Sequence, residues 1–186
     1  MLRRLVLLTG ALALSVSALA ADVGGVKLVD KASVGGQDLV LNGAGIRTRA
    51  FFKVYVAGLY VPAKSADPAA ILAKGPRRIQ LNLLRDLSGE QFVGALIDGL
   101  KENNSEAELA AVKAQVDQMT TIMKGFGEVK EGSFVTLDFV DGATQIGLNG
   151  SAKGTLAGEA FNKALTKIWI GDKPIQTDLK KALLGG

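Results

Sequence analysis

The stretch that decides the fold is AFFKVYVAGLYVP, residues 50–62. Aromatic and β-branched side chains favour extended structure, and Pro62 ends the run because it has no backbone N–H to donate to a neighbouring strand. Apolar side chains occupy both alternating faces. The stretch therefore predicts a central strand that is covered on both sides.

The residues upstream of this strand are richer in glycine and polar side chains. Residues 38–45 (DLVLNGAG) predict a strand that runs into a turn at Asn42-Gly43. Residues 22–37 predict a loosely held entry with at most one short strand.

Four further strands are predicted downstream. Residues 77–84 (RRIQLNLL) alternate apolar and polar side chains, as a half-buried strand does. Asp141-Gly142 separates residues 133–140 from residues 144–148 and is a strong signal for a two-residue hairpin turn. A short strand is expected near residues 151–155.

Two capping boxes mark the longest predicted helices. Ser88 with Gln91 begins a helix to about Asn103, and Ser105 with Glu108 begins one to about Lys124, ended by Gly125. In each box the side chains satisfy backbone N–H groups that the first helical turn leaves unpaired.

Shorter helices complete the pattern. Asp67-Pro68 supplies an N-cap and a first helical residue for a helix to Lys74, residues 157–170 form a helix with Trp169 in the core, and a last helix begins at Thr177. The order of strands, two helices, a hairpin and further helices predicts one α+β domain, residues 21–186, with an antiparallel sheet and helices on one face.

Residues 1–20 have the three parts of an export signal in order. Arg3 and Arg4 precede an uncharged apolar run, and Ala18-Leu19-Ala20 gives small residues at the two positions that a signal peptidase reads. The run is shorter than the roughly 20 residues that a membrane-spanning helix needs. We therefore expect cleavage after Ala20 and no lasting membrane anchor.

Composition excludes several classes of chemistry. The chain has no cysteine and no histidine, which excludes disulfides, thiolate metal sites and serine–histidine or cysteine–histidine catalysis. No metal or cofactor is expected. The formal charge of +4 includes the two signal arginines, and basic residues alternate with acids, so nucleic-acid binding is not expected.

Residues 41–61, LNGAGIRTRAFFKVYVAGLYV, resemble the chalcone isomerase superfamily, most closely its bacterial exported branch. Three further segments agree in order and spacing: residues 83–92 (LLRDLSGEQF), the hairpin at residues 133–148, and residues 168–185 (IWIGDKPIQTDLKKALLG). The resemblance implies an open-faced β-sandwich, in which a large antiparallel sheet has helices packed on one face and a cleft between the two.

The same resemblance implies three kinds of function: cyclisation of chalcones, binding of fatty acids, and ligand binding or assistance without catalysis. Its arginine matches Arg47, but its catalytic tyrosine matches Phe92 and a helix asparagine aligns near Gly99. A phenylalanine does not donate a hydrogen bond to an enolate, so efficient chalcone isomerase activity is not expected.

Fatty-acid-binding members pair the arginine with a tyrosine at the position of Tyr55. The resemblance therefore favours a ligand with an acidic head, a fatty acid or a phenolic molecule, held by Arg47 and Tyr55. Apolar Phe92, Leu96 and Leu100 are expected along its tail. The export signal predicts a periplasmic location and leaves full secretion open.

Two other functions stay open at this point. In an isomerase acting on another substrate, Arg47 would be the electrostatic catalyst. In an accessory or structural protein, the cleft would be filled by the chain's own side chains. Of the remaining residues, Arg85-Asp86 could reach the cleft, but a local ion pair that positions the following helix is favoured. Trp169, Met119 and Met123 predict core packing.

Overall fold

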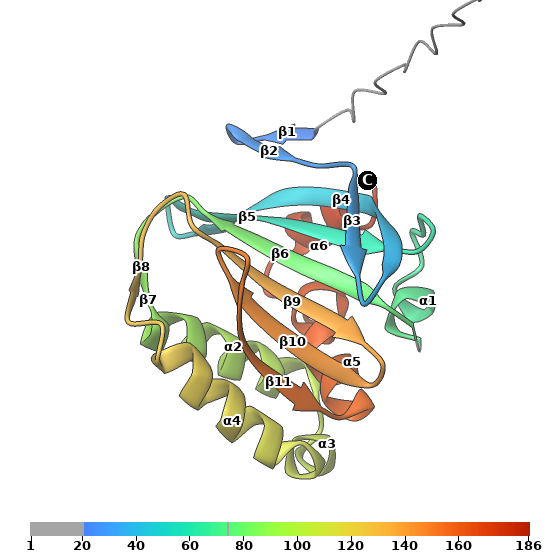
Figure 1. Ribbon diagram of the computed structural model, residues 1–186, viewed down its shortest axis with the longest axis vertical. Helices are drawn as coiled ribbons and strands as arrows, with labels where there is room; N and C mark the ends of the chain where they lie inside the picture. Colours follow the sequence, from blue (N-terminus) through green and yellow to red (C-terminus); the bar gives the residue numbers. More distant parts are fainter. Residues whose placement is uncertain (1–20, 74) are drawn as a thin grey trace, which may run out of the picture.

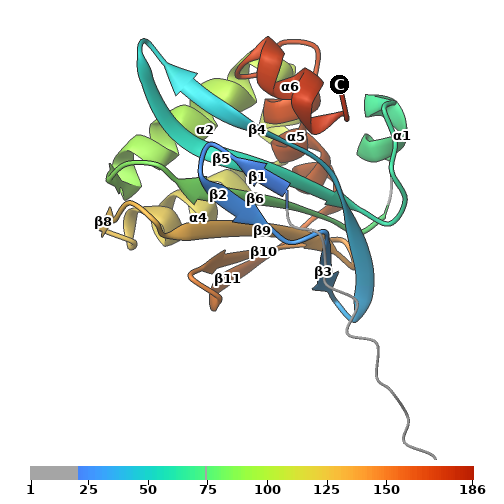
Figure 2. The same ribbon diagram turned by 90° about the horizontal axis from the view of Figure 1, so that it is seen from above.

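The computed structural model describes residues 21–73 and 75–186, so the predicted export signal lies outside the described residues (Figure 1). A seven-stranded antiparallel sheet has the order β11-β10-β9-β6-β5-β4-β3. The helices α2, α4, α5 and α6 lie on one face of this curled sheet (Figure 2). The predicted fold class is confirmed.

The strands of the large sheet are β3 (Lys31–Val34), β4 (Gln37–Arg49), β5 (Phe52–Val61), β6 (Arg77–Leu83), β9 (Phe134–Val140), β10 (Ala143–Leu148) and β11 (Ser151–Ala157). Two small sheets pair β1 (Ala21–Val23) with β2 (Val26–Leu28) and β7 (Leu87–Ser88) with β8 (Glu128–Val129).

The helices are α1 (Pro68–Leu72), α2 (Gly89–Asn103), α3 (Glu106–Ala111), α4 (Lys113–Lys124), α5 (Glu159–Ile170) and α6 (Thr177–Leu183). Both capping boxes and the Asp67 cap are present. Within residues 21–73 and 75–186, no helix has the length and apolar character that a membrane crossing requires.

Strand β5 is central and covered on both faces, as its composition predicts. Tyr55 and Leu59 belong to the main core between the sheet and the helices. Val56 and Tyr60 point to the other face, where a second core includes Leu28 of the β1–β2 hairpin. The strand therefore holds the two layers of the domain together.

The predicted turn at Asn42-Gly43 is wrong, because β4 continues through both residues. Asn42 is an extra residue in β4 at a register shift against β5. Its side-chain amide donates to the carbonyls of Leu183 (2.7 Å) and Ser65 (3.0 Å), and its Oδ1 accepts from the Ser65 backbone N–H (2.8 Å). The asparagine thus joins β4 to the last helix instead of reversing the chain.

Two other local predictions need correction. Residues 22–37 contain three short strands instead of one. The helix predicted from Ser105 to Lys124 is broken at Val112, which is buried and leaves helical geometry at φ −112° and ψ 11°. Gly125 caps α4 in a right-handed conformation, and the left-handed backbone occurs at Gly127 instead.

The predicted hairpin turn is confirmed. Asp141 and Gly142 both adopt positive φ values, 52° and 70°, and β9 and β10 pair on either side of them. Positive φ at both central residues matches the right-handed twist of the flanking strands.

Gly43 provides a direct test of the contact between β4 and α6. A Cβ at this position would lie 2.1 Å from the Ala182 carbonyl oxygen, which belongs to backbone and has little freedom to move. We predict that Gly43→Ala lowers the free energy of unfolding by about 1–3 kcal/mol, measured by urea denaturation.

The matched control is Gly94→Ala in α2. Its Cβ would meet no atom within 4 Å, so this variant should gain up to about 1 kcal/mol from improved helix propensity. Equal stability of the two variants would contradict the close approach of α6 to β4.

Candidate ligand-binding site

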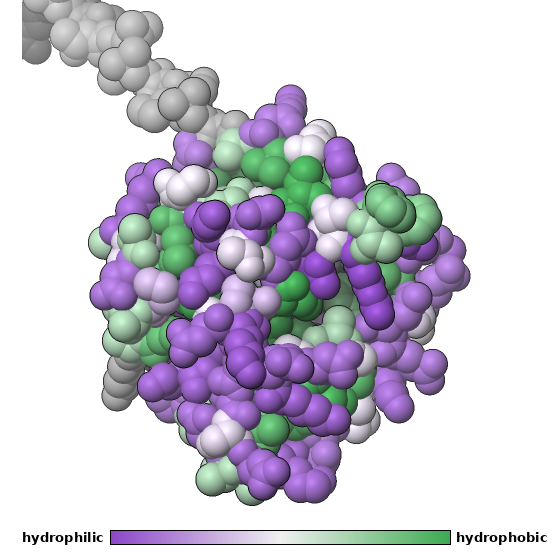
Figure 3. Space-filling model, turned by 180° about the vertical axis from the view of Figure 1, so that it is seen from behind, coloured by the Kyte–Doolittle hydropathy of each residue, from purple (hydrophilic) through white to green (hydrophobic). Residues whose placement is uncertain are grey.

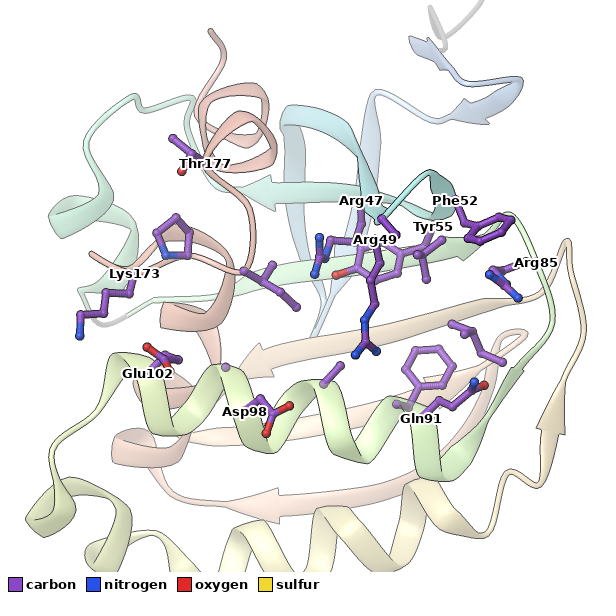
Figure 4. A pocket seen from close by; sticks show the side chains of 18 of the residues that line it. Arg47, Arg49, Phe52, Tyr55, Arg85, Gln91, Asp98, Glu102, Lys173 and Thr177 are labelled. Carbon is purple, nitrogen blue, oxygen red and sulfur yellow. The ribbon is translucent and has the colours of Figure 1, made fainter.

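A cavity of about 780 Å³ lies between the β4–β5 hairpin and α2, with the segment after α5 along a third side (Figure 4). This volume is in the range of small-molecule sites. Its lining consists of Arg47, Arg49, Ala50, Phe52, Val54, Tyr55, Arg85, Leu87, Gln91, Phe92, Ala95, Asp98, Gly99, Glu102, Asp172, Lys173, Pro174, Ile175 and Thr177.

Arg47 and Tyr55 are direct partners across β4 and β5, so their side chains share the helix-facing side of the sheet. Figure 4 shows the guanidinium group and the phenol hydroxyl turned toward one another within the cavity. The register shifts immediately after Arg47, where Val54 is an extra residue in β5. Such a bulge increases the local twist and re-aims the adjacent side chains.

Gln176 fixes the orientation of Arg47. Its Oε1 accepts hydrogen bonds from Arg47 Nη1 (3.2 Å) and from the Thr48 backbone N–H (2.8 Å), while its Nε2 donates to the Ile46 carbonyl (3.3 Å). Arg47 Nη1 also donates to the Thr48 carbonyl. The residue just before α6 therefore holds both the strand end and the cation that it carries.

Tyr55 is only 7% exposed, and its hydroxyl oxygen accepts a hydrogen bond from Trp169 Nε1 at 3.1 Å. Burial raises the pKa of Tyr55 to about 12, against smaller opposing effects of the Trp169 hydrogen bond and the Arg47 charge. Because Trp169 uses the oxygen as an acceptor, the phenol proton remains available to a ligand. Tyr55 is thus a neutral donor beside a cation.

Phe92 lies in the cavity wall, but Leu96 and Leu100 do not join it. Both leucines pack in the main core between sheet and helices and are not among the residues that line the cavity. Gly99 takes their place on the cavity side, where a Cβ would lie 2.7 Å from Ile168 Cγ2. The expected role of Leu96 and Leu100 along a ligand tail is therefore not supported by their positions.

Arg85 and Asp86 do not form the favoured ion pair with one another, and Arg85 reaches the cavity instead. Asp86 accepts hydrogen bonds from Lys130 (2.9 Å) and from the Glu131 backbone N–H (2.8 Å). The Arg85 guanidinium instead lies over the Phe52 ring, 5.1 Å from its centroid, and lines the cavity. Trp169, Met119 and Met123 are buried in the core as predicted.

Several cavity residues escape sequence reasoning. Arg49 lines the same cavity as Arg47. The two residues are two positions apart in one strand and therefore share a face, which is the one sequence signal for Arg49. Lys173 and Ile175 line the cavity and Gln176 binds Arg47. All three come from the segment between α5 and α6, which has no periodic pattern that predicts their place.

Charge is distributed unevenly around the rim. Arg47, Arg49 and Arg85 lie toward the β4–β5 hairpin, whereas three acids and one cation, Asp98, Glu102, Asp172 and Lys173, lie further along α2 and after α5. Across the described ranges, no group of three His, Cys, Asp or Glu side chains is arranged to hold a metal ion.

Comparison with solved structures finds a similar fold in the fatty-acid binding protein of Arabidopsis thaliana. The TM-score is 0.67 at 16% sequence identity, over 86% of this chain and 92% of that one. No curated protein sequence gives a significant match. The family model described as chalcone isomerase-like matches residues 20–185, nearly the whole chain. This chain therefore belongs to the chalcone isomerase-like family.

Proposed function

We propose that this chain is a binding protein for a fatty acid or a similar small molecule with an acidic head. The observation that carries the proposal is the convergence of Arg47 and Tyr55 in a largely apolar cavity. A guanidinium group matches the planar fork of a carboxylate, and such charge-assisted hydrogen bonds are stronger than neutral ones.

The two donors have complementary roles. Arg47 supplies charge, and its hydrogen bond to Gln176 limits the entropy lost when a ligand binds. Tyr55 supplies a neutral hydroxyl whose oxygen is already satisfied by Trp169. A carboxylate, which only accepts, fits both donors. A phenolate fits the same arrangement, which is why a phenolic ligand belongs to the proposal.

The cavity walls suit the apolar part of such a ligand. Val54, Phe92, Ala95 and Ile175 present hydrocarbon surface beside the two donors. Burial of an alkyl chain against these groups supplies most of the affinity, and the polar pair sets the orientation. The related fold of a fatty-acid binding protein adds support.

The isomerase alternative has less support. Stabilising an enolate calls for a hydrogen-bond donor where Phe92 lies, and the phenylalanine side chain has none. An accessory protein with a cleft filled by its own side chains is disfavoured by a cavity of about 780 Å³.

The proposal includes a periplasmic location. Support comes from the sequence of residues 1–20, which has the charged, apolar and small-residue parts of an export signal. The family model matches residues 20–185, so cleavage after Ala20 would leave all but the first matched residue in the mature chain.

Binding of oleate and oleyl alcohol to Arg47→Ala separates head recognition from packing. We predict that the variant binds oleate about tenfold to a hundredfold more weakly than the wild type, because a hydrogen bond to a charged group is lost. Its affinity for oleyl alcohol, which has no charge, should change little. Isothermal titration of delipidated protein measures both affinities.

The matched control is Lys153→Ala, which removes an exposed cation on β11, away from the cavity. It should leave both affinities unchanged. A wild-type protein that binds neither ligand, or an Arg47→Ala variant that loses both equally, would contradict recognition of an acidic head.

The raised pKa of Tyr55 predicts how stability depends on pH. Since the folded pKa of about 12 exceeds the ordinary value of 10.0, ionisation above pH 10 favours the unfolded chain. The contribution of neutral Tyr55 is intact below pH 10 and is lost as the pH rises toward 12. Tyr55→Phe should therefore lose less stability over this range than the wild type, measured as urea midpoints.

Tyr60 remains in both proteins and also has a raised pKa through burial, so the difference between the two curves isolates Tyr55. Parallel curves would show that Tyr55 titrates as an exposed phenol. Oleate affinity of the wild type should be constant up to about pH 10, since the donor keeps its proton.

Export is tested by expressing the full chain in a Gram-negative host and measuring the intact mass of the periplasmic protein. The mass should correspond to a chain that begins at Ala21. An Ala18→Lys variant should retain its signal, because the peptidase site no longer has small residues at both positions. A full-length wild-type protein in the cytoplasm would refute the proposed location.

A further inference from the structure

The tip of the β4–β5 hairpin exposes two adjacent phenylalanines. Phe51 is 97% exposed and Phe52 is 62% exposed. The other large hydrophobic residue with such exposure in the described part of the chain is Val29, on a different connection. A protruding aromatic pair is unusual on a protein surface and marks a candidate site for contact with a protein, a ligand or a membrane. In Figure 3, hydrophobic surface projects from the edge of the molecule where this hairpin ends.

The residues of the turn at the hairpin tip are unfavourable for the backbone conformation that the turn adopts. Residues 50 and 51 connect β4 to β5, and Ala50 adopts a positive φ of 54°. Asparagine or glycine normally occupies such a position, because a Cβ is strained there. An Ala-Phe turn gives up this advantage and projects an aromatic ring into solvent. Conflicts between local preference and structure are expected at functional sites.

Cations surround the aromatic pair. Arg49 and Lys53 flank it in sequence and are exposed, and the Arg85 guanidinium lies over the Phe52 ring. Residues 49–53 include no acid. The nearby carboxylate of Asp86 is already paired with Lys130 and the Glu131 N–H. The tip therefore combines apolar rings with positive charge. The ion pairs among the described residues do not involve Arg49, Lys53 or Arg85.

We propose that this tip inserts into the surface of a membrane that contains anionic lipids. Aromatic rings insert into the boundary between head groups and acyl chains, and lysine or arginine nearby is attracted to anionic head groups. A dimer interface fits less well, because two positively charged tips repel one another. A standard protein interface also uses about 20–30 residues on each side, many more than this hairpin offers.

The tip lies at the entrance of the cavity. Arg49, Phe52 and Arg85 belong to both the tip and the cavity lining, and Arg47 lies two residues further along β4. Cations thus extend from the tip to Arg47, where the acidic head of the ligand is proposed to bind. A membrane-bound tip would place the cavity beside the lipid surface. The benefit of that placement rests on the proposed function, whereas vesicle binding can be measured independently of it.

Vesicle sedimentation tests the proposal with the delipidated protein. The wild type should sediment with vesicles of phosphatidylcholine mixed with phosphatidylglycerol, less with phosphatidylcholine alone, and less at high salt. Phe51→Ser should weaken sedimentation about tenfold, because burial of the ring in the lipid is lost. The ring is almost fully exposed, so its removal should not affect the core. Lys53→Gln should weaken it about fivefold. Both variants should bind oleate in solution as the wild type does.

Val29→Ser is the matched control, because it removes an exposed apolar side chain away from the tip and should not alter sedimentation. The proposal is overturned if the wild type does not sediment at low salt, or if Phe51→Ser sediments equally well. It is also overturned if Phe51→Ser abolishes a dimer seen by ultracentrifugation without any vesicle binding. Vesicle binding by a protein that does not bind oleate would refute the proposed ligand alone.

Discussion

The hydrogen bond from Trp169 to the Tyr55 hydroxyl is the interaction on which the site depends. Tyr55 is only 7% exposed in a strand that is covered on both faces, and its hydroxyl is paired within the protein by Trp169. Trp169 only donates, which leaves the phenol proton for a ligand. The same contact joins α5 to the sheet. The core that stabilises the fold therefore also prepares one of the two polar groups of the cavity.

The other polar group depends on the last segment of the chain. Gln176 holds Arg47, while Asn42 and the absence of a side chain at Gly43 let α6 lie directly on β4. A mutation in this segment is thus expected to affect ligand binding through the orientation of Arg47, even where it contacts no ligand. Stability and recognition are coupled because both use the contact between β4 and the chain terminus.

Sequence reasoning recovers what is local and periodic. The capping boxes, the Asp141-Gly142 turn and the doubly covered strand follow from residue type and spacing alone. Asn42 misleads because its turn preference is overridden by hydrogen bonds to Leu183 and Ser65, which are far away in sequence. Leu96 and Leu100 lie outside the cavity lining, because a helical stripe indicates a buried face without distinguishing core from cavity. Arg47 and Tyr55 come from the family resemblance, and their ligand-binding role stays a prediction.

Charge along α2 gives the cavity a direction. The helix N-terminus near Gln91 carries partial positive charge, and Arg49 and Arg85 lie on the same side. Asp98 and Glu102 lie toward its C-terminal half, where the helix dipole is negative. A carboxylate is therefore attracted toward the hairpin and repelled from the far end, whatever the length of its chain. The proposed recognition of an acidic head at Arg47 and the proposed membrane contact of the hairpin are consistent with the same field.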